Sequence, residues 1–190
     1  YMPTELDISG FLFDYQKAIV RWALSSQKYA IFAECGAGKT VMFLEIAKHV
    51  IHKTNGKVLI LSPKNIIKQT IEESVMWYGD SLPILYITSR DDLIEWLKDD
   101  AHVNKLVISN YDKMIQGIIP EFNRLEGLIL DESSILKSSS GVIKVNIIKS
   151  VGGKSRASKG SAVPYRISVS ATPAPNDIVE YFSQSSFLGK

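Results

Sequence analysis

Short apolar segments alternate with longer amphipathic segments along most of the chain. Six runs of four or five residues are rich in Val, Ile and Leu, are bounded by Pro, Gly, Ser, Asn or Asp, and predict buried strands. These runs are Tyr29–Ala33, Lys57–Leu61, Ile84–Thr88, Lys105–Ser109, Gly127–Leu130 and Tyr165–Val169. Apolar residues at every third or fourth position predict helices over Tyr15–Ser25, Thr40–His52, Ile66–Trp77 and Asp91–Lys98. This order predicts an α/β fold, a mostly parallel sheet with helices on both faces.

One stretch departs from this alternation. From Ser133 to Ala162 the chain is crowded with Ser, Gly and Lys, which predicts a basic loop with one short helix around Val142–Ile148. The chain has 190 residues, 45% of them hydrophobic, which suffices for one core. We therefore predict a single domain over residues 1–190.

Charge and cysteine content exclude several classes of protein. Lys and Arg number 22 against 20 Asp and Glu, so a polyanion would have to be met by a local patch. A single cysteine, Cys35, excludes a disulfide within the chain, and the three histidines lack zinc-ligand spacing. No apolar run is long enough to span a bilayer, and residues 1–7 do not resemble a signal peptide. We expect a soluble, cytoplasmic protein that does not associate with membranes.

The first predicted strand leads directly into a glycine-rich loop of the phosphate-binding type. The loop contains Gly36, Ala37, Gly38, Lys39 and Thr40, and helical spacing begins at its end. Glycines let backbone N–H groups turn toward an anion, and the start of a helix points unpaired amides at the same place. Lys39 would reach the β and γ phosphates of a nucleotide, and the Thr40 hydroxyl would bind Mg²⁺.

One departure from the usual pattern and one alternative qualify this interpretation. The usual pattern has glycine where this chain has Ala33. The alternative is a plain glycine turn with an incidental lysine, but the strand before the loop and the helix after it favour phosphate binding.

An acidic pair follows the fifth predicted strand. Asp131 and Glu132 come directly after Gly127–Leu130. Asp131 would hold Mg²⁺, and Glu132 would orient and deprotonate the water that attacks the γ phosphate. An Asp-Glu pair after a strand is often only a solvated turn, so the interpretation depends on the phosphate loop upstream.

Together these residues resemble the first RecA-like lobe of superfamily 2 helicases, and more closely the Snf-type DNA translocases. The most discriminating stretch runs from Thr172 to Leu188 and reads T-P-x-x-N-x-x-x-E-x-x-S-x-x-x-F-L, a pattern of the Snf-type group that DEAD-box proteins lack. The resemblance implies a RecA-like P-loop NTPase with ATP and Mg²⁺ as cofactors. It also implies ATP hydrolysis coupled to movement on DNA, with duplex DNA favoured.

The resemblance also assigns a role to Gln16. The segment from Leu12 to Gln16 is similar to the family's Q motif, whose glutamine reads the adenine edge by donating and accepting at once. The alternative is a surface glutamine on an amphipathic helix. We expect the nearby Tyr15 and Trp22 to belong to the core.

Two further segments resemble motifs that line the nucleic-acid track in the family. Pro63 and Lys64 follow the second strand, and Ser109 and Asn110 end the fourth. Such side chains and nearby backbone amides can hold phosphates without reading sequence. The alternative is that both segments are ordinary turns between a strand and a helix.

Ser170, Ala171 and Thr172 match the family's S-A-T motif, which links the nucleotide site to the nucleic-acid site. The chain departs from the family in having Ser133 and Ser134 after the acidic pair, a form that looks like phage and prophage members. Family members continue into a second RecA-like lobe with arginine fingers. The chain ends at Lys190, so we expect that lobe as a partner and expect the isolated lobe to hydrolyse ATP slowly.

Other functions remain open from the sequence. The chain could be a different P-loop enzyme, such as a kinase or metabolic ATPase, or a non-catalytic module that holds nucleotide as structural support. It could also act on RNA, or belong to a larger restriction, repair or phage replication machine.

Overall fold

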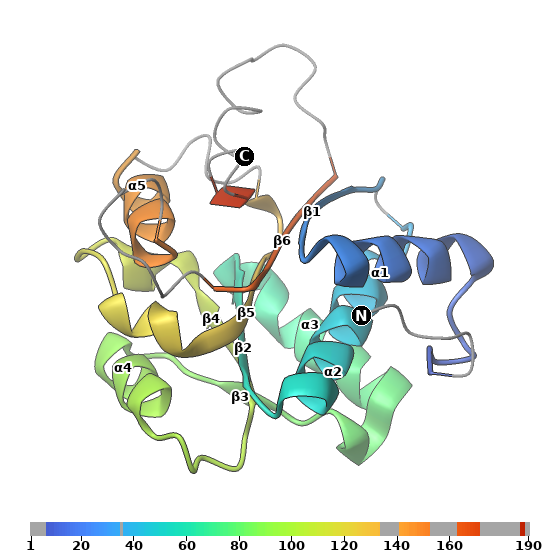
Figure 1. The fold of residues 1–190 in the computed structure, drawn as a ribbon, viewed down its shortest axis with the longest axis horizontal. Helices are drawn as coiled ribbons and strands as arrows, with labels where there is room; N and C mark the ends of the chain where they lie inside the picture. The colour runs from blue at the N-terminus through green and yellow to red at the C-terminus, as the bar shows by residue number, and fades with distance from the viewer. Residues whose placement is uncertain (1–6, 35, 134–140, 153–162, 172–186, 189–190) are drawn as a thin grey trace.

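The computed structural model describes residues 7–34, 36–133, 141–152, 163–171 and 187–188. In this part of the chain, six strands form one sheet in the order β1-β6-β5-β2-β4-β3, and every neighbouring pair is parallel (Figure 1). The strands are β1 (Lys28–Phe32), β2 (Lys57–Ser62), β3 (Ile84–Tyr86), β4 (Leu106–Asn110), β5 (Leu125–Leu130) and β6 (Tyr165–Ser170). Each predicted strand is confirmed, with ends that differ by at most two residues.

Helices cover both faces of the sheet (Figure 1). One face carries α1 (Asp14–Ser26), α2 (Lys39–Thr54) and α3 (Lys64–Tyr78), and the other carries α4 (Arg90–Lys98) and α5 (Gly141–Ser150). Short 3-10 turns lie at Gly79–Ser81, Tyr111–Met114 and Pro120–Arg124. The predicted helices are confirmed, including the short one at 142–148, while the rest of the predicted basic loop lies mostly outside the described residues. No helix in the described ranges is both long and apolar enough to cross a membrane.

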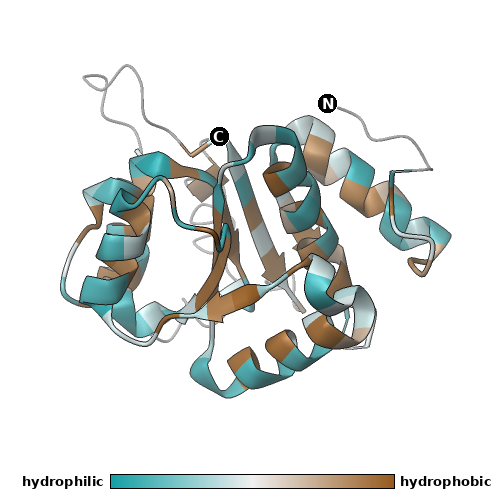
Figure 2. Ribbon diagram, turned by 90° about the horizontal axis from the view of Figure 1, so that it is seen from below, coloured by the Kyte–Doolittle hydropathy of each residue, from teal (hydrophilic) through white to brown (hydrophobic). Residues whose placement is uncertain are grey.

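The core consists of two hydrophobic clusters, one on each face of the sheet. Along β2, Val58 and Ile60 belong to the cluster under α1, α2 and α3, whereas Leu59 and Leu61 belong to the cluster under α4 and α5. Successive side chains of a strand point to opposite faces, so a strand covered on both sides must be apolar throughout. Figure 2 shows the hydrophobic strands between helices whose outer faces are largely hydrophilic.

A buried arginine joins β6 to the segments around it. Arg166 is 2% exposed, and its guanidinium donates hydrogen bonds to the carbonyl oxygens of Val163, Val151 and Phe187 at 3.0, 2.9 and 3.0 Å. Burial lowers the pKa of Arg166 from its ordinary value. The sequence did not predict that Arg166 would be buried and bind three carbonyl oxygens, because a single arginine within an apolar run does not indicate which groups it contacts.

A buried carboxylate attaches the segment before α1 to α2 and α3. Glu45 on α2 accepts hydrogen bonds from the N–H and hydroxyl of Ser9, at 3.0 and 2.8 Å, and from the Tyr78 phenol at 2.7 Å. Lys48 Nζ and His49 Nε2 lie 2.8 and 3.1 Å from Glu45 Oε1. Burial alone would raise the pKa of Glu45, but the hydrogen bonds outweigh it and hold that pKa below its ordinary value. The ionised carboxylate therefore stabilises the fold.

Replacing Glu45 should weaken the fold and flatten its response to acid. A carboxylate whose pKa is lowered by folding stabilises the protein above its unfolded pKa, and this contribution disappears as the pH falls through the folded pKa. We therefore expect the free energy of unfolding to fall between about pH 5 and pH 2 in the wild type. Glu45→Gln should cost about 3 kcal/mol at neutral pH and remove part of that acid dependence.

Urea unfolding followed by circular dichroism at several pH values would measure both effects. Glu72→Gln on α3 is the control, because the Glu72 side chain is 66% exposed and forms an ion pair with Lys68 on the same helix. An acid dependence that is the same in the Glu45 variant and the control would contradict the stabilising role of Glu45.

Candidate functional site

The loop between β1 and α2 is held open by two glycines in left-handed conformation. Gly36 has φ 86° and Gly38, the residue before α2, has φ 71°. A Cβ at Gly36 would meet nothing within 4 Å, so the loop borders open space. The first helical hydrogen bond runs from the Met42 N–H to the Gly38 oxygen at 3.2 Å. The N–H groups of Lys39, Thr40 and Val41, which lie between Gly38 and Met42, therefore lack an acceptor within the helix and can bind an anion.

Gln16 supports this loop from α1. Its Nε2 donates to the Ala37 carbonyl at 3.1 Å, and its Oε1 accepts the Phe13 N–H at 2.9 Å. A Cβ on Gly38 would lie 2.3 Å from Gln16 Nε2, so only glycine leaves room for this contact. Both ends of the Gln16 amide thus have protein partners in this structure, and the adenine contact stays a prediction.

The prediction that Tyr15 and Trp22 belong to the core is wrong. Their side chains are 49% and 57% exposed. The buried positions of α1 include Gln16, Val20 and Ala23, so these two aromatic residues lie at the side of the buried stripe. Tyr15 instead reaches the phosphate loop, where its hydroxyl donates to the carbonyl of Ala37 at 3.0 Å.

Asp131 is buried at the carboxyl end of β5. Its Oδ2 accepts a hydrogen bond from the Ser62 hydroxyl at 2.9 Å, and its backbone oxygen accepts one from the Tyr111 phenol at 2.6 Å. Burial raises the pKa of Asp131, the charge of Glu132 raises it further, and the Ser62 hydrogen bond offsets only part of this rise. The ends of β2, β4 and β5 therefore meet at Asp131, where Ser62 binds the carboxylate and Tyr111 binds the backbone carbonyl.

Glu132 faces the phosphate loop. Its φ is 47°, a left-handed conformation that costs a residue with a side chain about 1 kcal/mol. In this conformation Glu132 Oε2 lies 3.8 Å from Lys39 Nζ. The two side chains are 28% and 14% exposed, so solvent or a ligand can still reach them. The fold thus brings together the phosphate loop and the acidic pair, which lie far apart in sequence.

The residues present fit a magnesium ion bound together with a nucleotide. Thr40 lies in the first turn of α2, and Asp131 has a buried carboxylate. Among the described residues, no group of three or more His, Cys, Asp or Glu is placed to hold a metal ion. One hydroxyl and one carboxylate leave most of the six positions that Mg²⁺ prefers to phosphate oxygens and water, as is usual for a nucleotide-bound magnesium ion.

Only part of the predicted nucleic-acid residues is accessible. Pro63 precedes α3 and is buried, while Lys64 begins that helix and is exposed. Ser109 is fully buried and its hydroxyl donates to the Ile87 carbonyl at 2.7 Å, so it cannot touch a polymer in this conformation. Asn110 is 7% exposed, and its Oδ1 has no hydrogen-bond partner in the described part of the chain.

The predicted coupling motif is described only in part. Ser170 ends β6, is buried, and accepts the Ala33 N–H on its backbone oxygen at 3.2 Å. Ala171 follows it at intermediate exposure. Thr172 and the following residues to 186 lie outside the described residues, and so does most of the discriminating stretch. Its last two residues, Phe187 and Leu188, are buried in the cluster under α4 and α5.

A match to a protein family decides the classification. The model of the SNF2-related domain matches residues 15–190. The chain therefore belongs to the SNF2-related domain family. This family uses a nucleotide and typically Mg²⁺, which agrees with the loop and acidic pair described above.

Individual relatives of this SNF2-related domain are much longer proteins. DNA repair protein rhp54 of Schizosaccharomyces pombe is 26% identical over an alignment of 173 residues, and the match covers 81% of this chain and 19% of that protein. Regulator of nonsense transcripts 1 of Caenorhabditis elegans is 32% identical over 92 residues, 47% of this chain and 9% of that protein. The chain thus spans less than a fifth of either relative.

Solved structures share the fold of this SNF2-related domain. The Sulfolobus solfataricus SWI2/SNF2 ATPase core in complex with double-stranded DNA matches with a TM-score of 0.69 at 14% identity, over 98% of this chain and 37% of that one. The UvsW helicase of bacteriophage T4 matches with a TM-score of 0.68 at 18% identity, over 95% of this chain and 61% of that one. The RecA-like fold predicted from the sequence is confirmed.

Proposed function

We propose that this SNF2-related domain is the ATP-binding lobe of an ATP-dependent DNA translocase or helicase. The observation that supports this most directly is the approach of Lys39 to Glu132, at 3.8 Å, beside a loop with unpaired helix-start amides. A phosphate-binding cation and a carboxylate at one open place are what hydrolysis of a nucleoside triphosphate requires.

Each residue of the site has a defined task in this proposal. The backbone amides of Gly36, Gly38 and the first turn of α2 surround the phosphates, whereas the Ala37 N–H donates to the Glu34 carbonyl at 3.2 Å and so shapes the loop. Lys39 leaves Glu132 to pair with the β and γ phosphates. Thr40 and Asp131 would hold the magnesium ion, which would neutralise phosphate charge.

Glu132 performs the proton transfer of the reaction. Once Lys39 turns to the phosphates, the Glu132 carboxylate can accept a hydrogen bond from water and then its proton during attack on the γ phosphorus. Its left-handed backbone points the carboxylate back toward the loop, and the Tyr111 hydrogen bond to the preceding carbonyl supports this turn. Glu132 thus depends on β4 for its position.

The proposed partners are DNA and a second RecA-like lobe. The SWI2/SNF2 ATPase core that shares this fold is bound to double-stranded DNA, and the DNA repair relative supports the same polymer. A second lobe would add an arginine to the transferring phosphoryl group, a contribution of roughly 10³ to 10⁵ in rate. In the bacterial host of a phage or prophage the DNA lies in the cytoplasm, which is therefore the proposed location. The Ser133-Ser134 sequence supports a phage or prophage origin.

The hydrogen bonds to Asp131 suggest how DNA and nucleotide communicate. Lys64 is two residues after Ser62, and Asn110 is adjacent to Tyr111, so both candidate DNA contacts are close in the chain to donors that hold Asp131. A shift of either segment on DNA would move the carboxylate and the Glu132 turn. Ser170 and Ala171, with Thr172, form a further proposed link through the hydrogen bond to Ala33.

Steady-state ATP hydrolysis by the whole protein tests the proposal. We expect duplex DNA to raise turnover at least tenfold over the rate without polymer, because closure of the two lobes on DNA completes the site. Tyr111→Phe should reduce this stimulation more than it reduces the basal rate. Stimulation only by RNA would assign the protein to RNA, and turnover that ignores every polymer would leave only a P-loop ATPase.

A further inference from the structure

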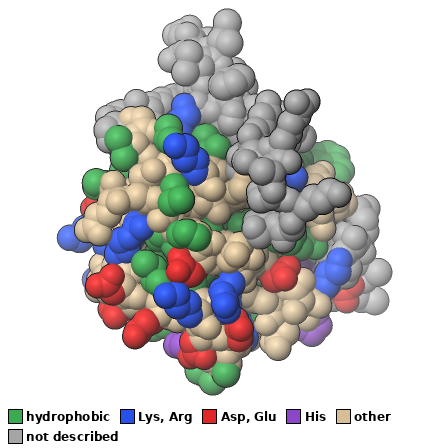
Figure 3. All heavy atoms as spheres, turned by 60° about the vertical axis from the view of Figure 1, so that its left-hand side comes forward, with side chains coloured by type: hydrophobic (Ala, Val, Ile, Leu, Met, Phe, Trp, Pro, Cys, Tyr) green, Lys and Arg blue, Asp and Glu red, His purple; other side chains and the backbone are tan. Residues whose placement is uncertain are grey.

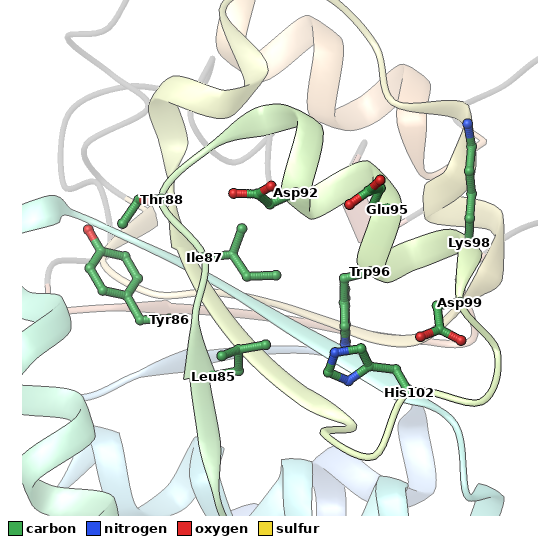
Figure 4. A pocket seen from close by; sticks show the side chains of 10 residues that line it. All are labelled: Leu85, Tyr86, Ile87, Thr88, Asp92, Glu95, Trp96, Lys98, Asp99 and His102. Atoms are coloured by element: carbon green, nitrogen blue, oxygen red, sulfur yellow. The ribbon is translucent and has the colours of Figure 1, made fainter.

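A hollow lies between the edge strand β3 and helix α4, at the sheet edge opposite β1. It measures about 660 Å³, and Leu85, Ile87 and Trp96 form its apolar part. Figure 4 shows Asp92 and Glu95 spread along α4, with Asp99 at its end. We call this hollow the β3–α4 groove. It uses none of the residues of the nucleotide site.

The edge strand gives this groove an unpaired backbone. In the described part of the chain, β3 pairs with β4 alone. The Ile87 N–H, directly after β3, donates to the carbonyl oxygen of Ile108 on β4 at 3.1 Å, and the Ile87 carbonyl oxygen accepts a hydrogen bond from the Ser109 hydroxyl. Successive residues of a strand direct their backbone groups to opposite edges, so those of Tyr86 point away from β4. A further strand can therefore pair along this edge.

The opposite wall of the groove is acidic. Asp92, Glu95 and Asp99 follow one another at steps of three and four residues, which places the first two along one side of α4 and the third directly after its end. Lys98, the basic residue at the same end, pairs with Glu121 of the Pro120–Arg124 turn at 3.6 Å. Figure 3 shows acidic side chains on the lower half of the face that includes α4, with Lys and Arg side chains among them.

The spacing of these carboxylates suits an extended ligand. Along α4 the steps correspond to roughly 4.5 and 6 Å, from a rise of about 1.5 Å per residue. In a strand, every second side chain points to the same face, about 7 Å apart. Flexible Lys or Arg side chains at alternate positions can bridge this small difference and meet the carboxylates in turn.

We propose that the β3–α4 groove binds an extended, basic segment of a partner protein, which adds as a parallel or antiparallel strand beside β3. Its backbone pairs with the outer edge of β3, and its Lys or Arg residues at alternate positions face Asp92, Glu95 and Asp99. Main-chain hydrogen bonds give such an added strand its affinity, and side chains give it specificity. The inference does not depend on ATP or DNA, so it stands or falls separately from the proposed function.

Fluorescence anisotropy with a short labelled peptide of alternating Lys and Val would test the proposal on the whole protein. We expect saturable binding that weakens with salt. Asp92→Asn combined with Glu95→Gln should weaken it about fivefold, since each exposed ion pair contributes roughly 0.2–1 kcal/mol. Asp91→Asn combined with Glu72→Gln is the matched control, because it removes the same two charges outside the groove and should leave binding unchanged.

Two further peptides separate strand addition from simple charge attraction. N-methylation at alternate backbone nitrogens removes the donors to β3 but keeps every lysine, and should weaken binding at least tenfold. Glu in place of Lys should abolish binding. Equal binding by the N-methylated peptide, equal loss in the groove and control variants, or no binding at low salt would each overturn the proposal. Self-association of the protein through β3 would also overturn it, because the occupant would then be a second copy. Circular dichroism of each variant checks that the fold is kept.

Discussion

Replacing Lys39 with alanine is expected to weaken ATP binding about ten- to a hundredfold. A hydrogen bond to a charged group contributes about 1.5–3 kcal/mol, and each 1.4 kcal/mol corresponds to a factor of ten in affinity. Lys39 begins α2, and its side chain is only 14% exposed beside Glu132, so no other lysine can easily take its place. Equilibrium titration with a fluorescent ATP analogue, with and without Mg²⁺, would measure the loss.

Lys68→Ala is the matched control for this titration. It removes the same charge from α3, where the Lys68 side chain is 89% exposed and pairs with Glu72. We expect the control to bind ATP as the wild type does. If Lys39→Ala also bound ATP with wild-type affinity, the assignment of the phosphate loop would be wrong.

Replacing Glu132 with glutamine should separate binding from turnover. The amide cannot accept the proton of the attacking water, and general base catalysis contributes roughly 10² to 10⁴ in rate. ATP binding should be kept or become tighter, because the change removes a negative charge 3.8 Å from Lys39 and so frees this lysine for phosphate. Single-turnover hydrolysis by the whole protein, together with the titration described for Lys39, measures both quantities.

Glu34→Gln provides the control for this experiment. Glu34 is exposed next to the phosphate loop, so the variant makes the same change of charge without touching the acidic pair. We expect its turnover to stay near that of the wild type. Turnover retained in Glu132→Gln would assign Glu132 a structural role at the end of β5 and would require another base.

Most of the architecture could be predicted because its signals are local. An apolar run such as Lys57–Leu61, short and bounded by Gly56 and Pro63, is typical of a strand buried on both faces, and each helix repeats its apolar residues at the helical period. The phosphate loop is equally local, since its glycines and Lys39 lie within a few residues of each other. The predicted order of strands and helices is confirmed, and the loop lies between β1 and α2 as expected, while phosphate binding by the loop stays a prediction.

The errors and omissions concern residues whose surroundings come from distant parts of the chain. Tyr15 and Trp22 are aromatic, yet the position of α1 against α2 leaves them exposed. Ser109 has a suitable hydroxyl, but the neighbouring edge strand covers it and takes its hydrogen bond. Arg166 and Glu45 are buried charges that no pattern revealed, because the contacts that bury them include carbonyls and hydroxyls from distant parts of the chain.

The sequence by itself determined the order of strands and helices, the phosphate loop and the acidic pair. These features depend on the spacing of residues along the chain, because the repeat of a helix or a strand fixes which side of the element each residue occupies. Only the tertiary structure decided that Glu132 lies 3.8 Å from Lys39, that Ser62 and Tyr111 hold Asp131, and that β3 and α4 enclose an acidic groove. Each of these three features involves residues from different elements. The strand order that brings those elements together depends on long-range packing, which cannot be inferred from the spacing of residues along the chain.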